Sequence, residues 1–221
     1  LEEGGRDVTE KPQRFSAEIL FEDAHELALN KPAGQVAQPT PGRVGESLLD
    51  VATAHLGHPA GLVHRLDKET SGVTVFGKTA ERTAALAEAF RLGHAKKKYL
   101  AITGPGLPAS GTIDLPLSKD PSRPGRWRAS RQANGIDALT TWERLFSGEF
   151  CVVALHPQTG RTHQLRAHLA GIGYPILGDS LYGGTGDTRC LLHAERLEVL
   201  GRTHVAPVPA DMQAFITRAG L

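Results

Sequence analysis

The stretch LVHRLDKETSGVTVFGKT, residues 62–79, places a single aspartate, Asp67, two positions after Arg65. An ionised aspartate can attack the anomeric carbon of a sugar or stabilise an oxocarbenium-like centre. A nearby guanidinium favours the ionised form of a carboxylate. In an extended segment, side chains two positions apart point to the same side, so Arg65 and Asp67 would face one cleft. The alternative is an ordinary solvated turn before a strand.

A second dense polar stretch, residues 160–168, supplies Arg161 and Arg166 as possible partners of that carboxylate. Glycosidases ordinarily use a pair of carboxylates. Here Glu69 and Asp179 are candidates for the second carboxylate only because they lie near these motifs. An aspartate with arginine and tyrosine nearby, and no clear second carboxylate, indicates a reaction in which no water is activated.

The motifs of several other enzyme classes are missing from the sequence. Histidines are frequent, but no H-E-x-x-H occurs and no Cys/His quartet has zinc-finger spacing. His163 and His168 lie five positions apart, and five residues turn a helix through about 500°, so their side chains would diverge. The glycine-rich run 182–187 lacks the Gly-Lys-Ser/Thr ending of a phosphate loop, and no G-x-S-x-G is found. We therefore expect no protein-bound metal.

The overall charge gives no signal for a polyanion-binding protein, since the formal net charge of the 221 residues is +1. A nucleic-acid surface would have to be local. The basic runs 96–98 and 123–131 are candidates, and a solvated face is the alternative for both. Cys151 and Cys190 form no disulfide framework, which fits a reducing compartment such as the cytoplasm. No stretch approaches the roughly 18 apolar residues of a membrane span.

Strands are expected to outnumber helices. Alternating apolar and polar residues predict hairpins over 17–32 and 138–157, and shorter strands at 73–76, 99–102, 112–115, 190–192 and 196–199. Helical spacing and capping residues predict helices within 45–57, 79–93 and 159–173. This pattern predicts an α+β fold with a largely antiparallel or mixed sheet. Residues 1–14 are expected to form a flexible tail, and residues 15–221 a single domain.

Four segments, in this order along the chain, resemble motifs of the RluA-type pseudouridine synthases. NKPAG, residues 30–34, resembles the early motif, and HRLDKETSG, residues 64–72, resembles the catalytic signature. KKYLAIT, residues 97–103, resembles the stretch that carries the active-site tyrosine, and residues 160–183 resemble the long late motif. With the closing segments LLHAERLEV and PVPAD, the resemblance covers about residues 18–216.

The resemblance implies a pseudouridine synthase fold, with a curved mixed or antiparallel sheet, flanking helices and a central RNA-binding cleft. It implies an RNA pseudouridine synthase that isomerises a specific uridine in structured ribosomal or transfer RNA. No cofactor is implied, because nothing is oxidised and no group is supplied from outside. A cytoplasmic monomer with no obligatory protein partner is expected. One departure is visible: Gln35 and Gln38 stand where the family often has a more apolar run ending in His-Pro, which leaves the local packing open.

The resemblance also implies roles for individual residues. Asp67 would be the nucleophile, and Arg166 would pair with its carboxylate. Tyr99 would stack on the flipped uracil and take the proton from C5. Arg65 would enter the RNA where the target base leaves. Three further residues would line the uracil pocket or contact the RNA: Leu165, His64 and Lys98.

Two other classes of function stay open from the sequence. One is an RNA-binding module that kept the fold and lost the activity, against which the presence of Asp67, Tyr99 and Arg166 counts. The other is a nucleoside hydrolase or glycosidase, against which the missing second carboxylate counts. The sequence also does not choose between attack of Asp67 at C1′ and removal of the C2′ proton.

Overall fold

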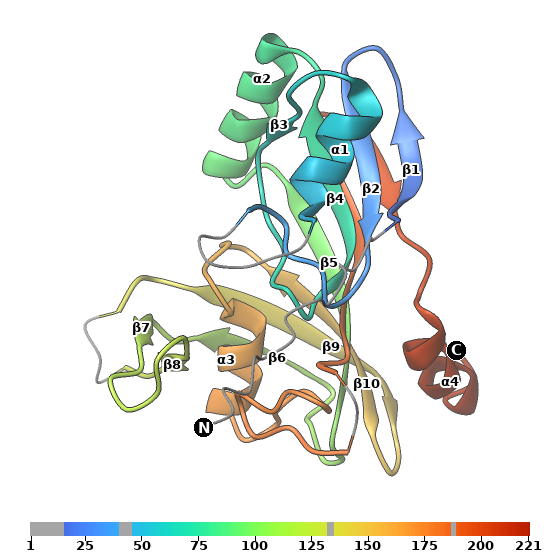
Figure 1. Cartoon of the computed structure of the whole chain (residues 1–221). Coiled ribbons are helices and arrows are strands. Elements are labelled where there is room, and N and C mark those ends of the chain that lie inside the picture. Colours follow the sequence, from blue (N-terminus) through green and yellow to red (C-terminus); the bar gives the residue numbers. More distant parts are fainter. Residues whose placement is uncertain (1–15, 40–45, 132–134, 187–188) are drawn as a thin grey trace, which may run out of the picture.

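The computed structural model of the chain describes residues 16–39, 46–131, 135–186 and 189–221 (Figure 1). The tail expected at residues 1–14 lies outside the described residues. The centre is a curved 10-stranded sheet whose main path runs in the order β1 (Glu18–Glu22), β2 (Glu26–Lys31), β4 (Ser71–Gly77), β11 (Leu192–Val199), β5 (Lys96–Thr103), β10 (Cys151–Pro157), β9 (Leu139–Ser147) and β6 (Ser110–Asp114). Two short strands join its side, β3 (Gly61–Leu62) on β4 and β12 (Arg202–Val205) on β11.

The sheet is mixed. β4 and β11 are parallel, whereas the other pairs between described strands are antiparallel. A separate antiparallel hairpin is formed by β7 (Leu117–Lys119) and β8 (Trp127–Ala129). With the four helices described below, this architecture confirms the predicted α+β class.

The helices cover the sheet in two regions (Figure 1). α1 (Leu48–Leu56) and α2 (Ala80–Arg91) pack on opposite faces of the part formed by β2 and β4. Alternation along β4 explains this, because Phe76 packs with α1 whereas Val73 and Val75 pack with α2. α3 (Gln164–Gly171) lies beside β8 and β10, and α4 (Ala210–Arg218) packs on the core around β5 and β10.

The helix ends follow the capping residues of the sequence. Ser47 and Asp50 form a capping box at the start of α1, and Gly57 ends that helix in the left-handed region with φ +71°. The Thr79 hydroxyl caps α2 by accepting the backbone N–H of Arg82 at 3.1 Å. Both helices were predicted, with Gly57 as the end of the first and Thr79 as the cap of the second.

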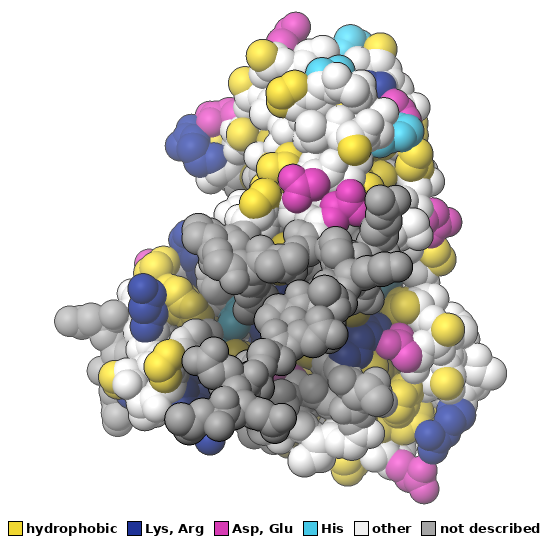
Figure 2. All heavy atoms as spheres, in the orientation of Figure 1, with side chains coloured by type: hydrophobic (Ala, Val, Ile, Leu, Met, Phe, Trp, Pro, Cys, Tyr) yellow, Lys and Arg dark blue, Asp and Glu magenta, His cyan; other side chains and the backbone are white. Residues whose placement is uncertain are grey.

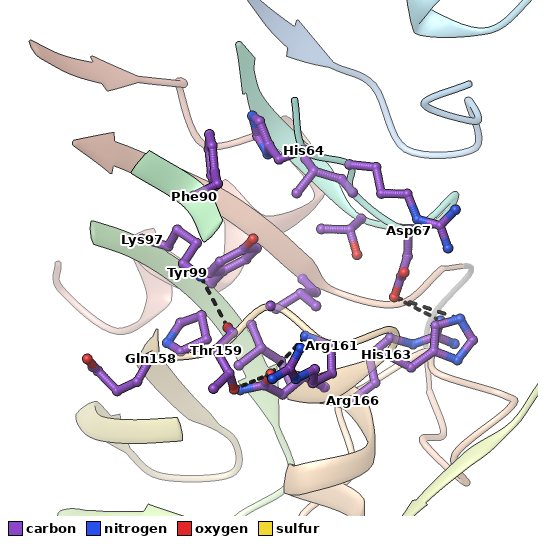
Figure 3. Close-up of a pocket in the computed structure, with 18 of the residues that line it drawn as sticks. His64, Asp67, Phe90, Lys97, Tyr99, Gln158, Thr159, Arg161, His163 and Arg166 are labelled. Atoms are coloured by element: carbon purple, nitrogen blue, oxygen red, sulfur yellow. Dashed lines mark hydrogen bonds and ion pairs between the residues drawn. The ribbon is translucent and has the colours of Figure 1, made fainter. Parts of the chain in front are cut away.

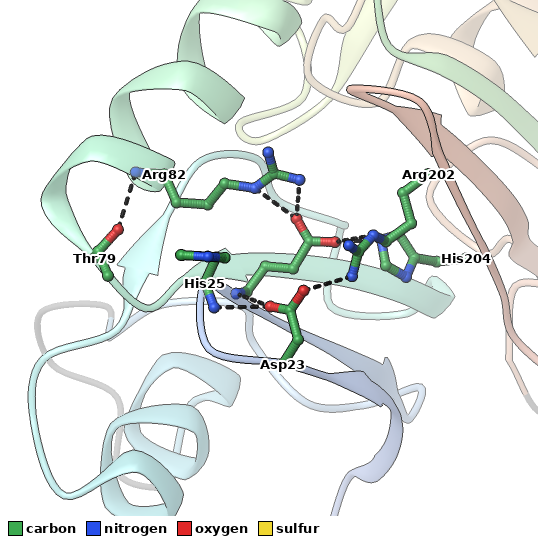
Figure 4. Close-up of polar contacts among 7 residues, drawn as sticks. Asp23, His25, Thr79, Arg82, Arg202 and His204 are labelled. Carbon is green, nitrogen blue, oxygen red and sulfur yellow. Dashed lines mark hydrogen bonds and ion pairs between the residues drawn. The ribbon is translucent and has the colours of Figure 1, made fainter.

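A buried carboxylate fastens three elements on the β1–β2 side of the sheet (Figure 4). Glu26, on β2, is fully buried and accepts a hydrogen bond of 2.7 Å from Nε of Arg82 on α2. Its other oxygen lies 3.3 Å from Nε of Arg202 and 3.2 Å from Nε2 of His204, both on β12. A buried charge requires such compensation, so these contacts tie α2 and β12 to β2.

Some elements differ from the sequence-based expectation. The strands expected at 190–192 and 196–199 are one strand, β11, whose register shifts between Ala194 and Arg196. This irregularity interrupts the alternation that marks a strand in sequence. The β7–β8 hairpin, β12 and α4 were not predicted. None of the helices in the described residues is both long and apolar enough to cross a membrane.

Candidate functional site

A cleft of about 640 Å³ opens between the loop after β3, the start of β5, and the segment from the end of β10 into α3 (Figure 3). The register of the sheet brings these segments together, because Gly72, Ala194, Tyr99 and Leu155 pair in turn across β4, β11, β5 and β10. Gly72 permits this approach. Its φ is +116°, and a Cβ there would lie 2.2 Å from the carbonyl oxygen of Ala194.

The loop that carries Asp67 is held by a buried lysine. Lys31 donates from Nζ to the carbonyls of Pro32 at 2.8 Å, Gln35 at 2.7 Å and Lys68 at 3.0 Å. The Lys68 carbonyl also accepts the N–H of Gly34 at 2.8 Å. Burial lowers the pKa of Lys31 to about 7, although nearby carboxylates raise it. Gln35, which departs from the family pattern, is itself fully buried in this arrangement.

Asp67 faces a buried arginine on α3, the one that the family resemblance implied (Figure 3). Nη1 of Arg166 lies 3.5 Å from Oδ2 of Asp67. Behind it, Nε and Nη2 of Arg166 donate to the two oxygens of Asp179 at 2.7 and 2.8 Å. Burial lowers the pKa of Arg166, but the hydrogen bonds and charge of Asp179 outweigh this and raise it above its ordinary value. Asp179 therefore fixes the guanidinium, whose remaining nitrogen points to Asp67.

Tyr99 and Leu165 line the same cleft. Tyr99 lies on β5 and is half-buried, and Leu165 precedes Arg166 on α3 and is 6% exposed. Burial raises the pKa of the Tyr99 hydroxyl above its ordinary value, and the negative charge of Asp67 raises it further. In the free protein Tyr99 is thus a neutral phenol at pH 7.

Arg65 and His64 reach the cleft in different ways. Arg65 is exposed at its rim. His64 accepts the backbone N–H of Val75 on Nε2 at 3.0 Å, and its ring stacks on Phe90 with centroids 4.5 Å apart. Burial lowers the pKa of His64 to about 3, so it is neutral at pH 7. His64 therefore forms part of the wall, with one ring nitrogen already occupied.

Lys98 does not face the cleft, although the sequence analysis assigned it to substrate binding. Its Nζ lies 3.2 Å from Oε2 of Glu195. Side chains alternate along a strand, so Lys97, not Lys98, lies on the side of Tyr99. Lys97 lines the cleft and donates from Nζ to the carbonyl of Thr159 at 3.1 Å (Figure 3). Of these two lysines, Lys97 is therefore the one that lines the cleft.

The basic run 123–131 covers β8 and the residues on either side of that strand. Arg123, Arg128 and Arg131 are exposed, whereas Arg126 lies 3.5 Å from Asp120. In Figure 2, Lys and Arg side chains lie over this hairpin, and both signs of charge are present over the rest of the face shown. The exposed arginines thus form a local basic surface on the hairpin that packs against α3, the helix that carries Arg166.

Two residues of this site were not assigned a role from the sequence. Asp179 was considered only as a second reacting carboxylate, yet it is 1% exposed and bound to Arg166. His163 was considered only as a metal ligand, yet its Nε2 lies 3.9 Å from Oδ2 of Asp67 (Figure 3). Both residues lie inside the long late motif, residues 160–183, which could have marked them as part of the site. Their spacing in the sequence did not show which side chains they contact.

The arrangement favours one reacting carboxylate over two. Among the described residues that line the cleft, Asp67 is the single Asp or Glu. In the same part of the chain, no group of three or more His, Cys, Asp and Glu side chains could hold a metal ion. A lone carboxylate beside a fixed cation suits attack on a sugar carbon or removal of a proton better than paired acid–base hydrolysis.

Comparisons with known proteins agree with this geometry. The sequence profile of a family described as RNA pseudouridylate synthase matches residues 25–171. Ribosomal large subunit pseudouridine synthase D of Xanthomonas campestris is 34% identical over 93% of this chain and 70% of its own. An uncharacterized RNA pseudouridine synthase of Zymomonas mobilis is 40% identical over 87% of this chain and 91% of its own. The solved structure of Human RNA Pseudouridylate Synthase Domain Containing 4 matches with a TM-score of 0.76 at 29% identity, covering 91% of this chain and 92% of that one.

Proposed function

The chain belongs to the RNA pseudouridylate synthase family and is an RNA pseudouridine synthase, and from this premise we propose that Asp67 is the nucleophile of the isomerisation. The observation that carries the proposal is the position of Asp67 as the one carboxylate among the described cleft residues, next to the fixed guanidinium of Arg166. Arg166, held by Asp179, presents a fixed positive charge to that carboxylate. Attack at C1′ and removal of the C2′ proton both require the ionised form of Asp67.

The chemistry needs few groups from the protein. The N1–C1′ bond of uridine breaks, the uracil turns, and a C5–C1′ bond forms. C5 then loses a proton and N1 gains one, so the product is an isomer of the substrate. While the base is detached, Asp67 is either bonded to C1′ or holds the C2′ proton, which it later returns, so no group from outside is needed.

We assign the proton transfer at C5 to Tyr99, whose ring also stacks on the uracil. The support is its place in the cleft next to Leu165, which would pack on the base. Because its pKa is raised, Tyr99 enters the reaction as a neutral phenol. Its hydroxyl therefore passes its own proton on toward N1, which gains a proton in this reaction, as it takes the proton from C5, instead of acting as a preformed phenolate.

The RNA is bound by the cations around the cleft. The uridine must leave its stack to reach Asp67, which costs a few kcal/mol. Arg65 is exposed at the rim, and its planar guanidinium can stack in the vacated space and bind phosphate. Lys97 and the basic hairpin around β8 add phosphate contacts. His64 has a packing role in the wall, because its Nε2 already accepts the Val75 N–H and its ring stacks on Phe90.

The substrate that we propose is a specific uridine in structured RNA. Ribosomal RNA is favoured over transfer RNA because relatives that match most of this chain are named for the large ribosomal subunit. We also propose that residues 15–221 form one catalytic domain, which acts in the cytoplasm as a monomer without an obligatory protein partner. The continuous sheet supports the single domain, and the free thiols of Cys151 and Cys190 fit a reducing compartment.

Product mapping tests this function. The purified protein is incubated separately with large-subunit ribosomal RNA and with transfer RNA, and pseudouridines are located in each. RNA from cells with and without the gene is compared at the same sites. We expect one or a few defined uridines of ribosomal RNA to be converted. Release of free uracil would indicate a hydrolase, and unchanged RNA would indicate a binding module; either result would overturn the proposal.

A further inference from the structure

The backbone at His163, just before α3, is unusual. Its φ is +55° and ψ is +19°, the left-handed conformation that side chains other than glycine rarely adopt. Within the described residues the other non-glycine case is Leu200, which lies in the tight turn between β11 and β12. His163 stands third in a turn that the Gln164 N–H closes by donating to the Arg161 carbonyl at 3.1 Å, and its side chain makes no capping hydrogen bond to α3. Strain of this kind is common where a side chain must be held in one place for function.

The His163 ring is held by a buried tyrosine. Its Nδ1 lies 3.1 Å from the hydroxyl oxygen of Tyr182, a residue that is 6% exposed. That oxygen also accepts the backbone N–H of Trp127 on β8 at 2.9 Å. The guanidinium of Arg166 lies over the Tyr182 ring at 5.1 Å from its centroid. Tyr182 thus connects His163, the basic hairpin and the arginine of the site.

These contacts favour one of the two positions for the ring proton of His163. The Tyr182 oxygen already accepts from Trp127, so its own hydrogen is free to donate to Nδ1 of His163. Nδ1 is then the acceptor, and the ring hydrogen lies on Nε2. Burial lowers the pKa of His163 and outweighs the negative charge of Asp67, which raises it. The ring is therefore neutral at pH 7. An N–H on Nε2 also suits its neighbour, the carboxylate of Asp67 at 3.9 Å.

We infer that His163 is a positioning residue for Asp67, with Tyr182 fixing its ring as the Nε2–H tautomer. This inference rests on the proposed role of Asp67 as the nucleophile. Both neighbours of the carboxylate, Nη1 of Arg166 and Nε2 of His163, approach the same oxygen, Oδ2. The other oxygen, Oδ1, is thereby left to face the ribose. At 3.9 Å the His163 contact is longer than a hydrogen bond, and a shift of about 1 Å on RNA binding would close it.

A matched pair of substitutions separates this role from a purely structural one. Asparagine tolerates the left-handed backbone, and its amide nitrogen overlaps Nδ1, so His163→Asn keeps the local fold but does not reach Asp67. Glutamine is longer, and its amide nitrogen overlaps Nε2, so His163→Gln restores a donor toward Asp67. Single-turnover rates at saturating RNA should fall about tenfold in His163→Asn, equal to about 1.4 kcal/mol, and recover largely in His163→Gln. The RNA Kd of both variants should stay within about twofold of wild type.

The tautomer itself is measured on the unmodified protein, so this arm does not depend on how variants fold. Long-range ¹H–¹⁵N correlation spectra of the labelled protein distinguish a protonated ring nitrogen from an unprotonated one, and His163→Asn assigns the signals. We expect the proton of His163 on Nε2. In Tyr182→Phe the two tautomers should mix and the rate should fall. Adding His163→Asn to Tyr182→Phe should then cost little more, because both act through one contact.

Three results would overturn the inference: a wild-type protein with the proton on Nδ1, a wild-type rate in His163→Asn, or equal losses in His163→Asn and His163→Gln. The proposed function fails separately. If Asp67→Asn still forms pseudouridine, the nucleophile assignment is wrong whatever His163 does. If Asp67 is essential and the His163 variants react normally, this inference alone is wrong.

Discussion

Replacing Asp179 by asparagine is expected to weaken both the fold and the reaction. The substitution keeps the shape of the side chain and removes its charge. Asp179 accepts hydrogen bonds of 2.7 and 2.8 Å from Arg166, and both side chains are almost fully buried. The change would leave a buried guanidinium with one amide oxygen in place of a carboxylate, and Asp67 would become the nearest anion.

The expected size follows from these contacts. Removing one partner of a buried ion pair costs about 3–5 kcal/mol of the free energy of unfolding. Asparagine keeps one acceptor, so we expect the lower end, about 3 kcal/mol, and a fall of roughly 6–12 °C in Tm for a chain of this length. A hydrogen bond to a charged group contributes about 1.5–3 kcal/mol. If the activation free energy rises by the same amount because Arg166 is no longer held in place, the reaction slows by roughly 10- to 100-fold.

Urea unfolding gives the first number, and single-turnover pseudouridine formation at a temperature well below Tm gives the second. Asp211→Asn is the matched control. Asp211 makes a comparable bidentate pair with Arg189, at 2.5 and 2.8 Å, but it is exposed, so its loss should cost no more than about 1 kcal/mol. If Asp179→Asn matches Asp211→Asn in stability and wild type in rate, Asp179 does not hold Arg166 and the reasoning fails.

Three further predictions concern other parts of the molecule. Glu26→Gln should lower the free energy of unfolding in urea by about 3 kcal/mol, because Arg82 and Arg202 lose a fully buried carboxylate. The rate of pseudouridine formation by the folded variant should be unchanged. A variant as stable as the wild type would show that these contacts do not compensate a buried charge. Arg65→Lys should be slow on a structured stem–loop and nearly normal on a short single strand with the same uridine, since base flipping is cheapest there; equal losses on both RNAs would exclude a flipping role. Tyr99→Phe should bind RNA normally and stall after glycosidic cleavage, and wild-type turnover in this variant would leave the hydroxyl without a role. In the wild type, the absorbance change of Tyr99 on ionisation should come only at a pH above the ordinary tyrosine pKa of about 10, because a raised pKa keeps the phenol protonated to higher pH.

The sequence was sufficient for much of the fold because local signals agreed with tertiary packing. Alternation and capping located β1, β2, α1 and α2, where Gly57 and Thr79 stand at helix ends in the structure. The late strand β11 was divided in two because its register shifts within the sheet. The short strands of the β7–β8 hairpin carry too few residues for alternation to show.

The motifs also located the main residues of the site, but not how they are connected. Asp67 and Arg166 are 99 positions apart, and the polar stretch 160–168 offered both Arg161 and Arg166 as partners, so only the family resemblance chose Arg166. The roles of Asp179 and His163 depend on which side chains the fold places behind and beside that pair, and spacing does not contain this information. The choice between Lys97 and Lys98 could have been made from the sequence. Side chains alternate along a strand, so once Tyr99 is placed in the cleft, Lys97 lies on the cleft side and Lys98 on the other.

The central claim is that the carboxylate of Asp67 carries the isomerisation, and Asp67→Asn tests it most directly. Single-turnover pseudouridine formation is measured for wild type and variant on the same RNA, together with RNA Kd and urea unfolding. The variant should fold and bind RNA as the wild type does and form no pseudouridine. Clear product from a clean preparation of Asp67→Asn would contradict the account.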